Sequence, residues 1–574
     1  MKNPLIQQNL LDKAIAYVSP KLAQQRLASR AQLALAGGYS GARMDRAALA
    51  RWNPGAGSAT ADIITDLPML RSRSRDQMRN APVAVGAINT ACSHVVGTGM
   101  SLTPSVNAEF LGLSDDEAQA WNADTALRFH TWANSQDADS ARQLNFYGLQ
   151  DLALRTVLES GDAFVVTPRL VRNGAAKLAL QLLEADRVSN PNRRADSDTV
   201  IDGVEVDPST MEALAYHVSN RHPGDVRTTG QLTWQRIAAR GANTGRRNVL
   251  HLFKPLRPGQ VRGVPWIAPI LEPLKQLNRY TDAELKAAVD SAIFSVFVKM
   301  DHTAFEQVFD TDAQGAIVQN AGKWTGELES GKAINLLPGE SIETNTPGRP
   351  NPQFDPFIMS ILRQIGMALE LPYEVLVMHY QSSYSAARAA LLMAWKFFRS
   401  RRDWLATNLC QPVYELWLAD EIAEGRISAP GYFQDDVVKA AWLSAMWTGD
   451  GPGSIDPQKE VAAAQERVDM GISTLESESI NFDGIGWAQK HKQRVREVHA
   501  RREDEIETDT ATVRLNADPG TPDTTTQSLL STLEAVASQP QPTIVLPQPK
   551  PHAIKVTPVR DAEGVILHTI QEPL

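Results

Sequence analysis

The chain has 574 residues, of which 43% are hydrophobic and 21% are charged, values typical of globular proteins. This length is too great for one ordinary core, so we expect two or more packed regions. A net charge of −9 argues against a dedicated nucleic-acid binder, because such proteins use excess positive charge to neutralise phosphates. Two cysteines, Cys92 and Cys410, exclude a disulfide framework and predict small buried side chains in a reducing cytoplasm.

The first 80 residues are basic, with twelve Lys or Arg and five Asp or Glu, a net charge of +7 that leaves −16 for the remainder. Helical apolar spacing over residues 1–40 breaks at Ser19 and Pro20. Four arginines then alternate with Ser and Asp, at positions Arg71, Arg73, Arg75 and Arg79. We interpret them as a solvated face, or else as a contact with a neighbouring subunit or nucleic acid.

No signal peptide or lipidation motif is visible in the sequence. The segment closest to a membrane span, residues 81–100, is interrupted by Asn89, His94 and three glycines, and we expect a buried helix that ends near Gly97.

Residues 118–253 have the pattern of a mixed α+β region. Helices are predicted at 118–134 and 146–159, and strands at 163–168, 178–183, 200–206, 215–218 and 249–253. A long helix follows at 267–296, with Pro269 and Pro273 in its first turns, where the missing N–H groups are tolerated. Its predicted core positions are Leu274, Leu277, Leu285, Val289 and Ile293.

The segment between this helix and the next one has a strand pattern instead of a helical one. Strands are predicted at 294–299, 316–318 and 333–337, which together form a small β-rich insertion. A second helix covers 355–370, and Leu371-Pro372 stops it. A third, long helix covers 385–424, with Ser382, Ser383 or Ser385 as its N-cap.

The C-terminal part changes character twice. Short helices and loops are predicted for 425–500, and residues 513–552 have the Pro-, Thr- and Ser-rich composition of a linker. An apolar patch at 554–569 has the alternation of a hairpin.

We predict no catalytic residue, cofactor site or metal site from the sequence. Residues 326–333 (GELESGKA) resemble a phosphate-binding loop around Lys332, but Ala333 replaces the hydroxyl residue that would hold Mg²⁺. The eleven histidines show no zinc-ligand spacing. Glu159 and Asp162 are interpreted as structural carboxylates at a helix end.

Two neighbouring segments invite a functional interpretation. The polar loop residues are His379, Tyr380, Gln381, Ser382, Ser383 and Tyr384, which form either a plain helix–helix loop or a loop that projects into a channel and touches DNA without reading bases. The next helix carries five basic residues, Arg388, Lys396, Arg399, Arg401 and Arg402. These are solvated, paired with a neighbouring subunit, or in contact with DNA phosphate, whereas Leu391, Leu392, Trp395 and Phe398 form an apolar stripe that belongs in a core.

An ordered set of short segments resembles the lambda-type portal proteins of tailed bacteriophages. The segments are RWNPG (51–55), ESGDAF (159–164), EADR (184–187), GVEVD (203–207), VLHLFK (249–254), RPGQVRGVPW (257–266), LPYEV (371–375), SSYSAAR (382–388) and IDP (455–457). They run over most of the chain. Each segment alone is weak, but in this order they are specific.

The resemblance implies a multi-domain, ring-forming α+β portal fold with an α/β wing, a helical stem, a small clip and a mainly helical crown. Mapped here, these parts are a basic N-terminal segment (1–80), the first part of the wing (81–266), a first stem helix (267–296), the clip (297–354), a second stem helix (355–371), a tunnel loop (372–384), a long wing helix (385–424), the wing end and crown (425–512), and a Pro-rich tail (513–574).

The resemblance also implies function and partners. A portal ring, typically a dodecamer, forms the channel at one capsid vertex through which DNA is packaged and ejected. It implies contacts with terminase, with head-completion or connector proteins, with capsid or scaffold protein, and with double-stranded DNA without sequence specificity, and it implies no membrane. The protein is then assembled in the host bacterial cytoplasm and resides in the virion. The alternatives are a DNA-acting packaging enzyme, either nuclease or ATPase, and a minor capsid protein that forms no channel.

Overall fold

The structure is a computed structural model that describes residues 10–35, 47–49, 51–52, 54–172, 175–225, 230–292, 296–300, 309–311, 317–319, 340–344, 352–380, 383–452, 457–503, 554–560 and 566–573. The chain divides into two compact units, residues 1–490 and residues 491–574. Helices and antiparallel strand pairs occur together, as the predicted α+β class requires. Within the described ranges, no helix is both long and apolar enough to cross a bilayer.

The first helices break where the sequence predicts. Helix α1 (Leu10–Val18) ends before Ser19, and α2 (Pro20–Leu35) begins at a proline, which fits the first position of a helix because its missing N–H has no partner there. Helix α3 (Ala59–Ile64) is capped by the side chain of Ser58, which accepts a hydrogen bond from the Ala61 N–H.

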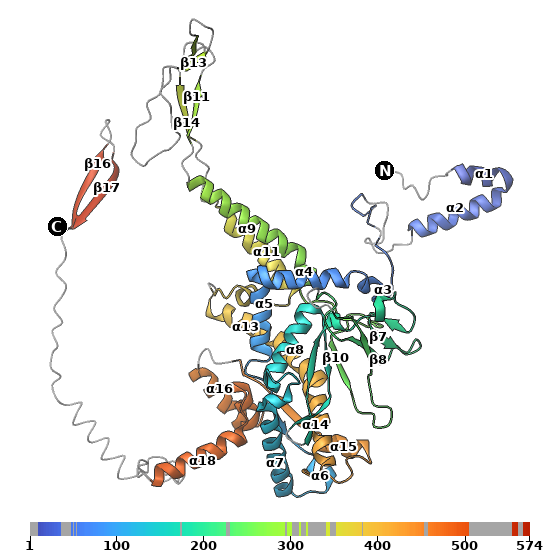
Figure 1. Cartoon of the computed structure of the whole chain (residues 1–574). Coiled ribbons are helices and arrows are strands. Elements are labelled where there is room, and N and C mark those ends of the chain that lie inside the picture. Colours follow the sequence, from blue (N-terminus) through green and yellow to red (C-terminus); the bar gives the residue numbers. More distant parts are fainter. Residues whose placement is uncertain are drawn as a thin grey trace, which may run out of the picture. The chain divides into compact units, whose positions relative to one another are not determined.

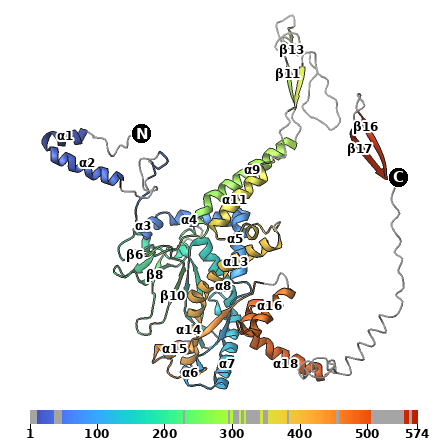
Figure 2. The same ribbon diagram turned by 180° about the vertical axis from the view of Figure 1, so that it is seen from behind.

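The largest hydrophobic core lies where α5 (Pro82–Val95) contacts α4 (Leu67–Asn80), α8 (Phe146–Ser160) and α13 (Tyr384–Leu405), as Figures 1 and 2 show. Small side chains such as Ala84 and Ala87 are fully buried on α5, so the neighbouring helices approach closely. The segment 81–100 is therefore the buried helix that was predicted.

Helix α7 (Asp115–Asn134) starts with a reciprocal capping box between Ser114 and Glu117. It places Phe129 at the centre of an aromatic cluster, with ring centroids between 5.1 and 5.9 Å from Phe146, Tyr414, Trp417 and Trp447. Edge-to-face aromatic pairs of this kind stabilise a core beyond their buried area. The short strand β1 (Ser101–Pro104) and helix α6 (Ala108–Leu111) precede α7.

Two antiparallel sheets and a two-stranded hairpin lie within the described part of residues 162–253. The three-stranded sheet has the order β10 (Val249–Phe253), β2 (Asp162–Val166) and β5 (Gln181–Glu184). The four-stranded sheet has the order β6 (Val200–Ile201), β7 (Val204–Val206), β8 (Ala213–Ser219) and β9 (Trp234–Ala238), and β3 (Arg169–Arg172) pairs with β4 (Ala175–Leu178). A second hydrophobic cluster, which includes Phe164 and Tyr216, joins the two sheets.

Two strand predictions are wrong in a way that turn chemistry explains. The single strand predicted at 200–206 is the hairpin β6–β7, because Asp202 and Gly203 adopt positive φ angles of 42° and 82° and form its two-residue turn. The strand predicted at 178–183 is split, since β4 ends at Leu178 and β5 begins at Gln181. Strands β1, β3 and β9 were not predicted.

The predicted long helix at 267–296 begins as the 3₁₀ turn η5 (Ala268–Ile270) and continues as α9 (Leu271–Ala292). It lies beside α11 (Phe354–Ala368) in both views, and Tyr280 stacks on Phe354 with ring centroids 5.6 Å apart.

Its inner half is buried as predicted at Leu274 and Leu277, but Leu285 and Val289 are 63% and 54% exposed. The prediction of core burial is therefore wrong for Leu285 and Val289, and Ile293 lies outside the described residues.

Between these helices lies the β-rich insertion that the sequence predicts. Strand β11 (Val296–Met300) pairs with β14 (Glu340–Thr344), and β12 (Phe309–Thr311) pairs with β13 (Ile317–Gln319). The strand predicted at 333–337 and the loop at 326–333 lie outside the described residues.

The single helix predicted at 385–424 is three consecutive helical pieces: α13, the π-helical turn η6 (Ala406–Cys410) and α14 (Gln411–Ala423). Pro412 explains the change, because proline lacks an N–H and clashes with the preceding turn of an α-helix, and a wider turn accommodates both effects. Cys410 and Cys92 are buried, as predicted, and burial raises the pKa of the Cys92 thiol to about 12.

The remaining described elements are mostly short, as predicted, although the last helix has 17 residues. They are α15 (Asp436–Trp442), β15 (Ala445–Thr448), which pairs with β1, α16 (Pro457–Asp469), α17 (Leu475–Asp483) and α18 (Trp487–Glu503). In the second unit, β16 (Ile554–Arg560) and β17 (Ile566–Pro573) form the predicted hairpin.

Candidate functional site

A buried carboxylate with several charged partners is that of Asp162, at the start of β2. Its carboxylate is fully buried and is surrounded by donors: Arg262 Nε lies 2.6 Å from Oδ2, and Arg71 Nη2 lies 2.9 Å from Oδ1. The imidazole of His251 on β10 lies 3.3 Å from Oδ2, and the backbone N–H of Gly263 donates to the same oxygen at 3.2 Å. We call Asp162, Arg71, Arg262 and His251 the Asp162 cluster.

All three guanidinium nitrogens of Arg262 donate hydrogen bonds within the fold. Nη1 donates to the carbonyl of Val188 at 3.0 Å and to the Asp202 carboxylate at 2.7 Å, and Nη2 donates to the carbonyl of Ala185 at 2.8 Å. A buried cation is tolerated when it is paired and fully hydrogen-bonded, and both conditions hold for Arg262.

The interpretation of the arginines at 71–79 as a solvated face or an external contact is wrong for Arg71. It is only 3% exposed, and its Nε donates to the carbonyl of Ser160 at 3.1 Å, so it is neither a solvated side chain nor a surface contact. Arg75 lies next to it on α4 and pairs with Asp186, whereas Arg73 and Arg79 are exposed. Alternating arginines on a helix thus divide between a buried side and a solvated side.

Two glycines allow the backbone segments beside this cluster to approach each other closely. Gly161 ends α8 with φ +93°, and a Cβ placed on it would lie 2.5 Å from the Gly263 carbonyl oxygen. A Cβ on Gly263 would lie 2.0 Å from the Gly161 carbonyl oxygen. Side chains at either position would separate the α8–β2 junction from the turn that leads into α9.

The electrostatics of the cluster favour charged Asp162 and neutral His251. Burial alone would raise the pKa of Asp162, but Arg262, Arg71 and the His251 hydrogen bond hold it well below its usual value. Burial lowers the pKa of His251 despite the opposing effect of Asp162. The imidazole stacks between Phe164 and Phe253, with ring centroids at 4.2 and 4.4 Å.

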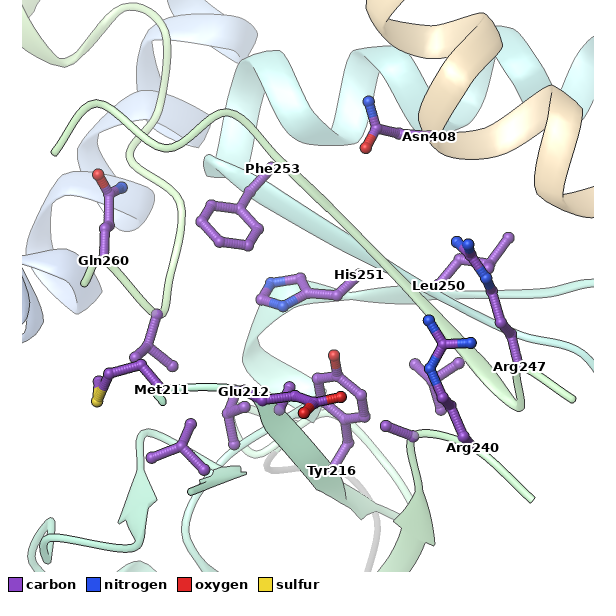
Figure 3. Close-up of a pocket in the computed structure, with 16 residues that line it drawn as sticks. Met211, Glu212, Tyr216, Arg240, Arg247, Leu250, His251, Phe253, Gln260 and Asn408 are labelled. Atoms are coloured by element: carbon purple, nitrogen blue, oxygen red, sulfur yellow. The ribbon is translucent and has the colours of Figure 1, made fainter. Parts of the chain in front are cut away.

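A cleft of about 350 Å³ opens beside this cluster, between β8 and β10 (Figure 3). Figure 3 shows the rings of Tyr216, His251 and Phe253 along it, with Arg240 and Arg247 at one end. The polar and charged side chains that line it are those of Glu212, Tyr216, Arg240, Arg247, His251, Gln260 and Asn408. Asp162 is fully paired with groups of its own chain, which gives it a structural role, as the sequence indicated.

Another group of side chains comes from two separate parts of the sequence. Glu184, Asp186 and His222 lie close enough to share an ion, with His222 Nε2 at 3.2 Å from Glu184 and 3.7 Å from Asp186. Because Arg75 already pairs with Asp186 and Glu184 is exposed, we assign no ion to this group.

The predicted polar loop follows the short helix α12 (Tyr373–Leu376), whose Val375 and Leu376 are buried. The His379 N–H donates to the Glu374 carbonyl at 3.1 Å, and the side chains of His379 and Tyr380 are exposed. Ser383 is the N-cap residue of α13 and is also exposed, although its side chain makes no capping bond. Gln381, Ser382 and the side chain of Tyr384 lie outside the described residues.

The five basic residues of α13 have different environments. Arg402 donates to the carbonyls of Val95 (2.9 Å), His94 (2.8 Å) and Asp450 (2.9 Å), so it caps the end of α5 within the fold. Arg401 lies over the ring of Phe397 at 5.1 Å, and burial lowers its pKa.

The other three are closer to the surface. Arg399 donates to Asn481 at 3.1 Å, Arg388 lies 3.9 Å from Glu460, and Lys396 is exposed. Their contact with a neighbouring subunit or DNA stays a prediction. Within the apolar stripe of α13, Trp395 and Phe398 are buried as predicted, whereas Leu392 is 58% exposed.

The family comparison decides what this architecture belongs to. A sequence profile described as "Phage portal protein, lambda family" matches residues 45–402, more than half of the chain. The chain belongs to the lambda family of phage portal proteins. It is therefore a portal protein, a structural component of the phage particle, and the resemblance in the sequence is confirmed.

Curated relatives agree with this assignment. Portal protein B of Escherichia phage lambda is 27% identical over 477 residues, which cover 79% of this chain and 88% of the relative. The portal protein of Escherichia phage N15 is 26% identical over 479 residues, with the same coverage of both chains. A probable portal protein of Halomonas phage phiHAP-1 is 26% identical over 431 residues, which cover 73% of this chain and 77% of the relative.

Two solved structures are similar at lower levels. A virion of a native gene transfer agent particle matches with a TM-score of 0.36 and 13% identity, over 73% of this chain and 92% of that chain. The neck of a native gene transfer agent particle computed with C12 symmetry matches with a TM-score of 0.34 and 12% identity, over 71% and 91%. TM-scores in this range are too low to establish a shared fold, so the assignment depends on sequence.

Proposed function

We propose that copies of this portal protein close into a ring, a dodecamer, around a channel through which double-stranded DNA enters the capsid during packaging and leaves during infection. The observation that carries the proposal, together with family membership, is the exposed apolar outer half of the helix pair α9–α11. Leu285 and Val289 lie one turn apart on α9 and are 63% and 54% exposed, and Phe357 on α11 is 50% exposed.

A soluble chain rarely exposes a group of large apolar side chains without a partner for them. In a closed ring each copy offers two different faces to its neighbours, so that every copy is covered on both sides. Packing of α9 and α11 against the same helices of adjacent copies would bury these residues.

We assign the parts of the portal fold accordingly, as proposals. Residues 267–296 and 355–371 are the two stem helices, 297–354 the clip, and 372–384 the tunnel loop. Residues 81–266 and the long helix of 385–424 belong to the wing, and 425–512 to the wing end and crown. Residues 1–80 and 513–574 are a basic N-terminal segment and a Pro-rich tail.

The tunnel loop would touch DNA without selecting a sequence. His379 and Tyr380 are exposed polar side chains, and contacts of such groups with phosphate oxygens carry no sequence information. The net charge of −9 supports passage rather than grip, because an acidic wall repels the phosphate backbone.

The clip would dock terminase during packaging and head-completion or connector proteins afterwards, and the wing would contact capsid or scaffold protein. Assembly would take place in the host bacterial cytoplasm, and the mature location would be the portal vertex of the virion. Another protein would supply the energy for DNA movement, since the loop at 326–333 has Ala333 in place of the hydroxyl residue that would hold Mg²⁺.

Negative-stain microscopy and light scattering of the purified full chain test the ring. We expect rings with a central hole; a chain that stays monomeric at every concentration and salt condition would refute the proposal. An ATPase and nuclease assay tests the absence of catalysis. Turnover that Lys332→Ala abolishes would refute that part.

A further inference from the structure

Helix α18 carries more Lys and Arg residues than any other described helix or strand, in a chain that is acidic overall. It contains six Lys or Arg and two Glu, a net charge of +4, which leaves −13 for the rest of the molecule. The cations are Lys490, Lys492, Arg494, Arg496, Arg501 and Arg502. The helix lies beyond residue 402, where the match to the family profile ends. The sequence shows this charge directly.

The side chains of α18 face solvent. From residue 491 to 502 every described residue is exposed except Val498, which is partly covered. Lys490 pairs with Asp483 at 2.6 Å. Within the described part of the chain, the side chains of Lys492, Arg494, Arg496 and Arg501 make no ion pair or hydrogen bond. Four cations are therefore available to a ligand.

The four cations lie on two opposite sides of the helix. Lys492 and Arg496 lie one turn apart on one side, and Arg494 and Arg501 lie two turns apart on the opposite side. Like charges four residues apart repel each other in a helix, so α18 carries self-repulsion that a bound polyanion would relieve.

The ligand class follows from what α18 lacks. A helix that docks in a protein groove or on a membrane needs a continuous apolar face. Between Lys490 and Glu503 the only large apolar side chains are Val495, which is 40% exposed, and Val498. Cations on two sides of a helix without an apolar stripe match the evenly charged phosphate backbone of DNA instead.

We propose that α18 is a DNA-binding element that contacts phosphates without reading bases. The proposal builds on the proposed function, since it takes DNA as the polyanion, and it places a phosphate contact outside the predicted tunnel loop. The exposed cations of α18 would add a DNA contact to a chain that is acidic overall.

The test compares three forms of the full chain by fluorescence anisotropy with a labelled duplex of random sequence, over a series of NaCl concentrations. The first form is the natural chain, and the second carries Lys492→Glu, Arg494→Glu, Arg496→Glu and Arg501→Glu. The matched control carries the same charge change at other exposed cations, Lys177→Glu, Arg193→Glu, Arg194→Glu and Arg240→Glu.

We expect the α18 variant to lose at least tenfold in affinity at low salt, and the slope of log K against log salt to become shallower by about 4, or about one for each lost phosphate contact. The control should keep most of the slope. Equal losses in both variants, or no loss in the α18 variant, would overturn the proposal.

Labelled polyglutamate distinguishes an acidic protein as the ligand: if the α18 substitutions abolish its binding and leave DNA binding unchanged, the DNA assignment is wrong. Light scattering of the same samples separates this proposal from the ring. Rings with an unchanged salt slope would refute only the α18 proposal, whereas a changed slope without rings would refute only the channel.

Discussion

The base of α9 and its outer half are organised by opposite rules. At the base, the charges of Asp162, Arg71 and Arg262 are buried and satisfied entirely by groups of the same chain. On the outer half, Leu285 and Val289 are apolar and remain exposed. The charged groups at the base have all their partners within one chain, whereas the apolar side chains of the outer half do not. This difference supports the proposal that a second copy packs along the outer half of α9 and not at its base.

Removing the cation at the base should have the largest effect on folding. Arg262→Met leaves Asp162 buried with Arg71 as its remaining guanidinium partner, and we expect the free energy of unfolding of the first unit to fall by about 3–5 kcal/mol. The control is Arg236→Met, which breaks the pair with Glu205 on the surface and should cost less than about 1 kcal/mol. Thermal and urea unfolding of both variants measure the difference; equal effects would contradict a special role for the buried pair.

A Cβ at the glycine contact should have the next largest effect. Gly161→Ala adds backbone strain at φ +93° and a steric clash with the Gly263 carbonyl, and we expect a loss of about 3 kcal/mol. Gly112→Ala has a similar positive φ of 68° in open space, so it should cost only about 1 kcal/mol for strain. Urea midpoints of the two variants isolate the clash, and a smaller effect at Gly161 than at Gly112 would show that the contact yields.

The cluster should also make stability depend on pH in acid. The folded pKa of His251 is lowered, so its stabilising contribution is complete above its unfolded pKa of about 6.5 and decreases as pH falls below it, by at most about 1.4 kcal/mol per pH unit. The folded pKa of Asp162 is also lowered, so its contribution is complete above about 4 and is lost as pH falls through the folded value.

Unfolding midpoints between pH 8 and pH 4 measure this dependence. His251→Phe keeps the aromatic stack and removes the titrating group, so the decrease that begins near pH 6.5 should become smaller. An unchanged profile in His251→Phe would assign the acid sensitivity to other residues.

The outer half of α9 should give the smallest change in folding and a large change in assembly. Leu285→Glu with Val289→Glu should alter the unfolding free energy of the isolated chain by no more than about 0.5 kcal/mol per site, because both side chains are exposed. The same pair should shift the chain from rings to smaller species in light scattering. Leu127→Glu on α7, at a residue that is 68% exposed, is the control. Rings that survive the α9 substitutions would show that the outer half of α9 is not a contact between copies.

Most helices and strands could be predicted from the sequence, but the Asp162 cluster could not. The strand Val249–Phe253 was predicted with its observed bounds, and the helices at 146–159 and 355–370 were predicted within two residues, because apolar periodicity and Pro or Gly boundaries are local properties. The burial of Leu285 was predicted wrongly, since an apolar position on a helix does not reveal whether its partner belongs to the same chain.

What the sequence determined by itself is the order of most elements, the absence of a complete phosphate-binding loop, the family and the basic charge of α18. What only the tertiary structure decided is the pairing of Asp162 with Arg71 and Arg262, which lie 91 and 100 residues away in the chain. The physical reason is that local pattern follows backbone geometry and solvent preference, whereas a buried ion pair depends on which distant charges share one desolvated space after folding.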